Sequence, residues 1–228
     1  MFVNQSKSVL TKEYGQIDGN AFICRNLVDC SIYLCDLIGS VYIDDCSNCV
    51  FYTGPVKSSL FMRGCSSCQL HTVVNQLRIS NSENIEVFGF SSTQTTLEKV
   101  NNLLLGPHLF TYPQLRQQIN ESNFQITKNR IFKVHDFTPS DGNWAIVEPA
   151  SLPSVSTYGY SGEGDAMEEV SPIPLPVYFG GELVWDIFCI KDEDDTNDND
   201  YTISGQLNTS SPSTLNSTKS FKVVHLKK

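Results

Sequence analysis

Two cysteine pairs have the residue type and the spacing of a metal site. Cys46-x-x-Cys49 and Cys65-x-x-Cys68 are separated by the segment Val50–Gly64, an interval within the range used by zinc sites with four cysteine ligands. Four thiolates at this spacing would hold the ion tetrahedrally and stabilise the fold around it. A zinc-dependent module is therefore one hypothesis, and it predicts about one zinc ion per chain.

An internal repeat explains the same spacing without a metal. Five four-residue units recur, and their last residues are 19, 19, 17 and 18 positions apart: Leu27–Cys30, Cys46–Cys49, Cys65–Cys68, Ser82–Ile85 and Val100–Leu103. Apolar residues take the cysteine positions in neighbouring units. We therefore favour cysteines that are inward-facing rungs of a core, stacked about 4.8 Å apart. Disulfides are the third alternative.

Short β-prone runs follow and separate the repeated units. Val50–Thr53 and Ser59–Met62 are examples, and Gly, Asn and Ser stand at the corners between such runs. Short strands that recur at this nearly constant period are typical of a parallel β-helix. We predict an all-β fold of this kind, with about five coils over roughly residues 20–106.

Arg78 is the charged side chain that this arrangement would present. Side chains alternate along a strand, so inward-pointing Leu77 and Ile79 place Gln76 and Arg78 outward on one face. Neighbours one coil away are expected on the same face: Lys57 and Ser59 below, and Gln94, Thr96 and Glu98 above.

Glu98 comes slightly more than one repeat after Arg78, so it would lie diagonally across from it in the next coil. That diagonal is about 7–8 Å between backbones, within reach of two long side chains. A carboxylate there could hold the guanidinium in position. The alternative is an ordinary surface salt bridge, which contributes little to stability.

The histidines are better explained as structural residues than as catalytic ones. No serine or cysteine nucleophile can be paired with His71 or His135 from the sequence. We therefore predict no hydrolase active site within this chain.

Composition excludes several classes of partner. The net charge of −9 argues against nucleic acid and against an anionic membrane surface, since both require a basic face. No apolar run could span a bilayer, the start lacks a signal-peptide pattern, and Phe2 excludes N-myristoylation of this form. We therefore expect no direct membrane anchor, a cytoplasmic location, and eight cysteines that are reduced.

The sequence divides into four predicted regions. Residues 1–15 are polar and are predicted to be a flexible lead-in, and residues 16–150 form the β-helix domain. A short helix should begin after Tyr112-Pro113. Residues 151–190 are a Pro/Gly-rich strap with two candidate strands, at Val177–Phe179 and Leu183–Ile190. The acidic and Ser/Thr/Asn-rich residues 191–228 are predicted to be disordered.

Several short motifs stand in a fixed order over about residues 16–150: Gly54–Cys68, Asn75–Arg78, Leu97-Glu98, Tyr112-Pro113, His135–Pro139 and Asn143-Trp144. Together they resemble the tubulin-binding cofactor C domain family. The His135–Pro139 motif followed by Asn143-Trp144 is especially similar to the retinitis-pigmentosa (XRP-type), GTPase-activating branch. The resemblance implies a right-handed parallel β-helix capped by C-terminal segments.

The resemblance also implies a function and a set of site residues. Family members activate GTP hydrolysis in trans, on an Arf-like small GTPase in ciliary traffic or on tubulin. Arg78 matches the family's arginine finger, and Gln76 matches the second glutamine of its Gln-Gln-x-Arg motif. Asn75 replaces the first glutamine, Glu98 matches a family glutamate, and Phe137 matches a phenylalanine that contacts the GTPase.

Such a protein acts on a partner and has no complete active site of its own. This chain has no Walker-type glycine loop, so Mg²⁺ and GTP would belong to the partner and no cofactor to this chain. The resemblance further implies work in the cytoplasm at the cilium, basal body or cytoskeleton. The alternative is a non-catalytic, tubulin-related binding module or tubulin-folding cofactor that uses the same β-helix face.

Overall fold

A computed structural model describes residues 1–126, 128–140, 142–148 and 151–159, and the backbone of four short strands nearer the C-terminus. The chain divides into two compact units, Met1–Leu175 and Pro176–Lys228. In the described part of the chain, no helix has the length and apolar character needed to cross a membrane.

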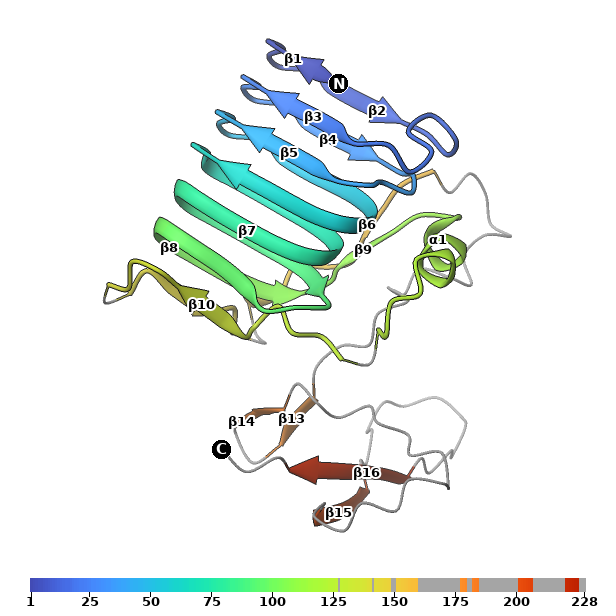
Figure 1. The fold of residues 1–228 in the computed structure, drawn as a ribbon. Coiled ribbons are helices and arrows are strands. Elements are labelled where there is room, and N and C mark those ends of the chain that lie inside the picture. The colour runs from blue at the N-terminus through green and yellow to red at the C-terminus, as the bar shows by residue number, and fades with distance from the viewer. Residues whose placement is uncertain are drawn as a thin grey trace. The chain divides into compact units, whose positions relative to one another are not determined.

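The first unit is a stack of parallel coils, about six in number (Figure 1). Its strands are β1 (Phe2–Val3), β2 (Val9–Lys12), β3 (Phe22–Arg25), β4 (Ser31–Leu34), β5 (Val41–Asp44), β6 (Val50–Arg63), β7 (Ser66–Ser91), β8 (Thr95–Pro107), β9 (Phe110–Thr111), β10 (Val134–Asp136), β11 (Trp144–Ile146) and β12 (Ser156–Thr157). Every strand pair between named strands of this unit is parallel. The predicted parallel β-helix is confirmed.

The five repeated units each form one corner of a coil. Their first and last residues are buried in all five coils, including Cys46, Cys49, Cys65 and Cys68. The third residue of each unit has a positive φ, between 52° and 56°: Asp29, Asn48, Ser67, Asn84 and Asn102. Short polar side chains tolerate this left-handed conformation at low cost. In each repeated unit, therefore, the first and last residues point into the core and the third residue makes a sharp bend between them.

Residues 1–15 contain strands, in contrast to the predicted flexible lead-in. β1 pairs with β3 and β2 pairs with β4, so this segment forms the first coil of the stack. Phe2 packs edge-on against Phe22, with ring centroids 5.2 Å apart. A terminal coil has a neighbour on one side only, so most of its side chains remain exposed or half-buried. Its polar sequence reflects that exposure.

One outer surface of the stack carries a ladder of aromatic rings, and segments that follow the last coil pack on it. Tyr33, Tyr52, His71 and Phe88 lie one above another, with successive ring centroids 4.8, 4.7 and 5.2 Å apart. Phe110 of β9 packs on Tyr52 at 4.8 Å, and β9 is in turn paired with β12. His71 is thus a buried structural residue, as the sequence predicts.

His71 should make the stability of the fold depend on pH. Burial disfavours its imidazolium form and lowers the pKa of His71 from 6.5 to about 4. The unfolded chain takes up this proton near pH 6.5, whereas the folded chain takes it up only near pH 4. The free energy of unfolding should therefore be highest above pH 6.5 and fall as the pH drops toward 4. Urea unfolding at a series of pH values measures this slope.

The variant that tests this assignment is His71→Phe, which keeps an aromatic ring in the ladder and removes the titrating group. Its stability should fall less steeply between pH 6.5 and 4 than that of the wild type. Part of the slope should persist, because burial also lowers the pKa of His108, to about 3. An unchanged slope would show that His71 does not titrate as argued.

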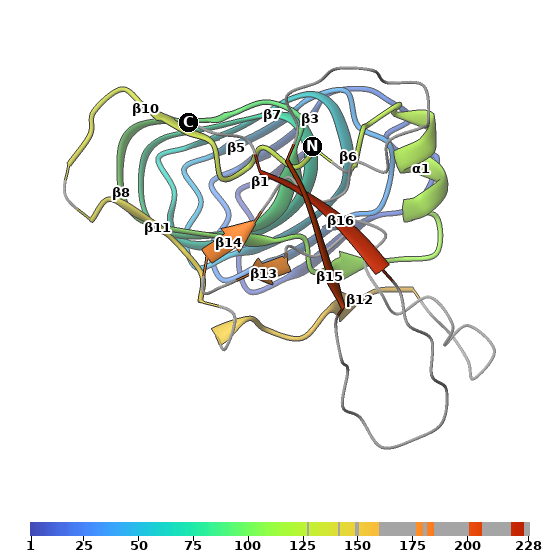
Figure 2. The same cartoon turned by 90° about the horizontal axis from the view of Figure 1, so that it is seen from below.

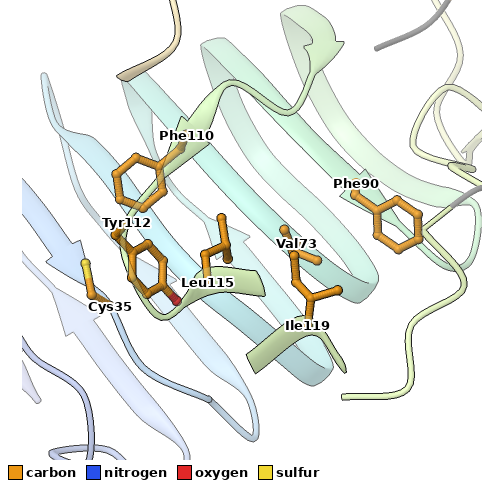
Figure 3. Close-up of a cluster of buried hydrophobic side chains, with 7 residues drawn as sticks. All are labelled: Cys35, Val73, Phe90, Phe110, Tyr112, Leu115 and Ile119. Carbon is orange, nitrogen blue, oxygen red and sulfur yellow. The ribbon is translucent and has the colours of Figure 1, made fainter. Parts of the chain in front are cut away.

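A second outer surface is covered by α1 (Leu115–Glu121). The packed cluster in Figure 3 joins the helix to the coils through Cys35, Val73, Phe90, Phe110, Tyr112, Leu115 and Ile119. Figure 2 shows the nested coils with α1 against one side. The helix predicted after Tyr112-Pro113 is present.

The second unit contains two antiparallel strand pairs. β13 (Val177–Phe179) pairs with β14 (Glu182–Val184), close to the two candidate strands of the predicted strap. β15 (Tyr201–Gln206) pairs with β16 (Ser220–His225), within the region predicted to be disordered. The remainder of the strap and tail predictions falls mostly outside the described residues.

Candidate functional site

The remaining outer surface carries Arg78. We call the outer side of β3, β5, β10 and residues 59–63, 76–80 and 95–98 the open face, because its side chains, apart from that of Asp44, are half-buried or exposed. Leu77 and Ile79 are 0% and 1% exposed, whereas Arg78 lies at the surface. The predicted alternation along this strand is confirmed.

The column through Arg78 is fixed by strand register. Phe61 of β6 lies one coil below Arg78, and Thr96 of β8 and then His135 of β10 lie above it. Ser59 lies below Gln76, so the predicted placement of Lys57 and Ser59 under Gln76 and Arg78 is wrong by two positions. Two irregularities, between Tyr52 and Pro55 and between Val56 and Ser59, each shift the register by one residue at this coil.

Phe61 is the immediate support of the Arg78 guanidinium. The guanidinium carbon of Arg78 lies 5.9 Å from the ring centroid of Phe61, and that ring stacks on Tyr42 at 5.2 Å. A cation–π contact of this kind contributes about 0.5–1 kcal/mol at an exposed site. It restricts the arginine without neutralising its charge.

Glu98 occupies the predicted diagonal position. It pairs with Ser80, the second residue after Arg78. Within the described residues, however, the ion pairs are those of Asp44 with Arg25 and Arg63, and Arg78 takes part in neither. The bracing of Arg78 by Glu98 stays a prediction.

Phe137 joins the same surface from a segment much further along the chain. It follows β10, and its N–H donates to the Leu97 carbonyl at 2.9 Å, which places it beside Glu98. Its side chain is 64% exposed and meets the His135 ring edge-on at 4.5 Å. A large exposed aromatic ring on an ordered segment is available for contact with another protein.

The side chains of Gln76 and Asn75 lie in different places, one within the open face and the other at its edge. Gln76 Oε1 accepts a hydrogen bond from Ser59 Oγ at 3.2 Å, within the open face. Asn75 lies at the edge of that face and lines a groove with Lys57 and Ser92. The fold thus brings Gln76, Arg78, Glu98 and Phe137 together on the open face and leaves Asn75 at its border.

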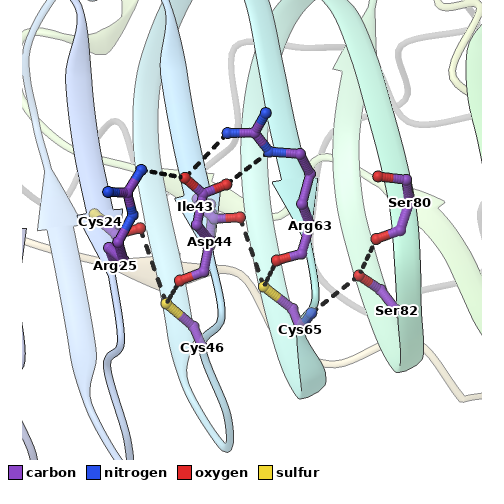
Figure 4. Close-up of polar contacts among 9 residues, drawn as sticks. All are labelled: Cys24, Arg25, Ile43, Asp44, Cys46, Arg63, Cys65, Ser80 and Ser82. Atoms are coloured by element: carbon purple, nitrogen blue, oxygen red, sulfur yellow. Dashed lines mark hydrogen bonds and ion pairs between the residues drawn. The ribbon is translucent and has the colours of Figure 1, made fainter.

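Next to the Arg78 column, the Asp44 carboxylate bonds to arginines of the coils on either side of its own (Figure 4). Asp44 accepts hydrogen bonds from Arg63 Nε at 2.7 Å and from Arg25 at 3.0 Å. Burial by itself would raise the pKa of Asp44, but the hydrogen bonds from the two arginines outweigh burial and hold the pKa below its ordinary value. These two arginines are held by Asp44, and Arg78 is the arginine of this face that lies outside their cluster.

The cysteine pairs are core rungs. Cys46 and Cys65 donate through their thiols to carbonyl oxygens of their own and the neighbouring coil. The seven described cysteines are buried and free, and in the described part of the chain no group of three or more His, Cys, Asp or Glu side chains is arranged to hold a metal. Residues in a stacked ladder produce the zinc-like spacing.

Burial should make these thiols unreactive in the folded protein. Desolvation raises the pKa of Cys24 to about 12, so little thiolate is present at neutral pH. With a thiol reagent at pH 7.5, we expect at most one of the eight cysteines to react rapidly before denaturant is added. Rapid reaction of four or more cysteines would contradict a buried ladder. One bound zinc ion per chain by elemental analysis would instead support the zinc-site hypothesis.

With this geometry established, comparison with known proteins places the chain. The family model described as tubulin binding cofactor C matches residues 19–137. The chain belongs to the tubulin binding cofactor C family. Protein XRP2 of Mus musculus is 34% identical over 181 residues, which is 78% of this chain and 48% of that protein. Tubulin-specific chaperone C of Homo sapiens is 25% identical over 150 residues, or 66% of this chain and 42% of that protein.

The resemblance to the XRP-type branch is therefore confirmed at the level of sequence. This chain spans less than half the length of each of these two relatives. Among solved structures, Tubulin Binding Cofactor C from Leishmania major aligns with a TM-score of 0.47 and 15% identity, over 68% of this chain and 97% of that one.

Proposed function

We propose that this chain is a GTPase-activating protein that supplies Arg78 in trans to an Arf-like small GTPase in its GTP form. The observation that carries the proposal is the state of Arg78. It stands outward on the open face, supported by Phe61, with no carboxylate paired to it among the described residues.

The chemistry suits such a side chain. GTP hydrolysis requires stabilisation of negative charge on the transferring phosphoryl group, and a finger supplied by a second protein is worth about 10³–10⁵ in rate. Arginine is always charged and donates in a planar fork. A stack of paired strands loses little conformational entropy in presenting it.

The neighbouring residues take supporting roles. Gln76 and Glu98 flank Arg78 and would position it in the complex, while Phe137 would contact the GTPase on the side of β10. Asn75 would contact the partner from the border of the face. Mg²⁺ and GTP belong to the partner in this proposal. Work in cilium- or microtubule-related traffic in the cytoplasm is proposed from the XRP-type resemblance.

The direct test is single-turnover GTP hydrolysis with purified Arf-like GTPases, in the presence and absence of this chain. At least one GTPase should hydrolyse GTP faster when the chain is present and should bind it more tightly in the GTP form than in the GDP form. No acceleration with any member of the panel would count against the proposal.

A second function is favoured by the match to Tubulin-specific chaperone C. In this alternative the open face binds tubulin, either without catalysis or as a folding cofactor, and Arg78 is one contact at the rim. Tubulin in place of the small GTPases in the same assay separates the two. Binding without nucleotide preference and without rate acceleration would support a non-catalytic module, whereas faster hydrolysis by tubulin would support the cofactor role.

A further inference from the structure

A basic groove borders the open face, and of its described lining residues the proposed function uses Asn75 alone. The groove has a volume of about 410 Å³. One wall is formed by corners of successive coils, at Lys57, Asn75 and Ser92. The other is the segment that follows α1, with Phe124, Lys128 and Arg130 among its lining residues.

The two walls are held together by a specific set of hydrogen bonds. The side-chain amide of Asn129 donates to the Gly89 carbonyl at 2.9 Å, and its oxygen accepts the N–H of Ser91 at 3.1 Å. The Arg130 N–H donates to the Ser91 carbonyl at 2.8 Å. Phe124 packs on Phe90, with centroids 5.9 Å apart. The shape of the groove is therefore set by the fold.

The charge of the groove is opposite to that of the whole chain. Lys57, Lys128 and Arg130 line it, all three are exposed, and no carboxylate lines it among the described residues. None of these three cations is in an ion pair with a described residue. In a chain of net charge −9, three cations gathered with no counter-ion among the described residues form a local attraction for negative charge.

The dimensions favour an extended chain over a single anion. Successive coils are about 4.8 Å apart, so a wall of three corners runs about 10 Å along the stack. An extended peptide advances about 3.3 Å per residue, and three residues would fill that length. Lysine and arginine pair well with carboxylates, and the amide of Asn75 can bond to peptide backbone groups.

We propose that this groove binds an acidic, extended peptide segment of a partner protein. Asn75 is the middle of the three corners, and Gln76 beside it lies on the open face, so a bound segment would run along the stack beside the Arg78 column. The groove would then supply a second contact, separate in its chemistry from the finger.

The proposal is tested with a fluorescent ten-residue peptide of alternating glutamate and glycine, and with its glutamine counterpart as the neutral control. Fluorescence anisotropy should show binding of the glutamate peptide alone, weakened by added salt. Lys57→Gln combined with Lys128→Gln should weaken that binding about fivefold or more, because each cation pairs with a carboxylate. Lys7→Asn, which removes an exposed charge on the first coil, should leave it within about twofold.

NMR of the complex provides a second measurement, in which the side-chain amide signals of Asn75, Asn123 and Gln125 should shift on addition of the peptide. The proposal is overturned by equal binding of both peptides, by a double variant that binds like the wild type, or by an equal loss in Lys7→Asn. Binding to phosphatidylserine vesicles in place of the peptide, with the same sensitivity to the double variant, would instead assign the groove to membranes. None of these readouts involves GTP, so failure here is distinct from failure of the proposed activation.

Discussion

Arg78→Ala is expected to reduce the stimulated rate of GTP hydrolysis at least about 10²-fold, while partner binding and the fold are retained. The expected loss follows from the typical worth of an arginine finger. The fold should be retained because Arg78 is exposed and its described contact is a single cation–π interaction with Phe61. Removing it should cost less than about 1 kcal/mol of stability.

The measurement is single-turnover hydrolysis at saturating concentration of this chain, with binding to the GTP-bound partner measured separately. Arg78→Lys keeps the charge but loses the planar fork, so we expect it to recover only a small part of the rate. Arg116→Ala changes an exposed arginine of α1, on another surface of the stack, and should leave stimulation unchanged.

Equal stimulation by the wild type and Arg78→Ala would exclude the finger. Loss of binding together with loss of rate would point to an interface residue, as in the non-catalytic alternative. Comparing the two quantities is informative because a finger acts mainly on the transition state, whereas a rim contact contributes to binding in both states.

The core of this fold could be predicted because similar residue types recur at the same position of successive repeats. Positions such as Cys46 and Cys49 recur as apolar or small residues in the five coils that carry the repeated unit, and their left-handed corner recurs as Asp, Asn or Ser. Each coil must satisfy the same steric conditions as the next. The outward direction of Arg78 then followed from alternation along its strand.

The neighbours of Arg78 were harder to predict, since they depend on register. The step from the third repeat unit to the fourth, Cys68 to Ile85, is two positions shorter than the steps before it. The register shifts by one residue between Tyr52 and Pro55 and by one more between Val56 and Ser59, and the two shifts together place Phe61 under Arg78. The shorter spacing is visible in the sequence and could have identified Phe61, but only if both shifts were assigned to the segment before Ser59.

Contacts between distant segments could not be predicted from the period at all. Phe137 lies beside Glu98 because β10 adds a strand to β8 after the chain has passed through β9 and α1. The partner contact proposed for Phe137 rests on family resemblance alone. The basic groove likewise depends on Asn129, which bonds to Ser91 and Gly89 of a much earlier coil. No local pattern in the sequence specifies such pairings.

Gly54→Ala is expected to have the largest effect on stability, and it tests how the stack is joined to α1. A β-carbon at this buried position would collide with the backbone carbonyl oxygen of Asp36 and with the hydroxyl of Tyr112. Both neighbours are fixed. The Asp36 carboxylate accepts the N–H groups of Ile17 and Asp18 at 2.6 and 2.8 Å, and the Tyr112 hydroxyl donates to the Gln118 side chain.

Relief of the collision therefore requires movement of a buried turn or of the cluster beneath α1. We expect the free energy of unfolding to fall by about 3 kcal/mol or more, which corresponds to a decrease in Tm of about 6–12 °C for a domain of this size. Urea and thermal unfolding measure both quantities. Tyr112→Phe in the same background removes only one of the two obstacles, so it should not restore stability.

Gly15→Ala is the matched control, because it adds the same methyl group where nothing lies within 4 Å. Gly15 has a φ of +77°, so alanine there carries only the left-handed backbone cost of about 1–2 kcal/mol. If Gly54→Ala proved no more destabilising than Gly15→Ala, the close approach of the two coils at Asp36 would be wrong. A large difference between the two variants would show that Gly54 is required because it lets this coil, the turn at Asp36 and Tyr112 meet at one point.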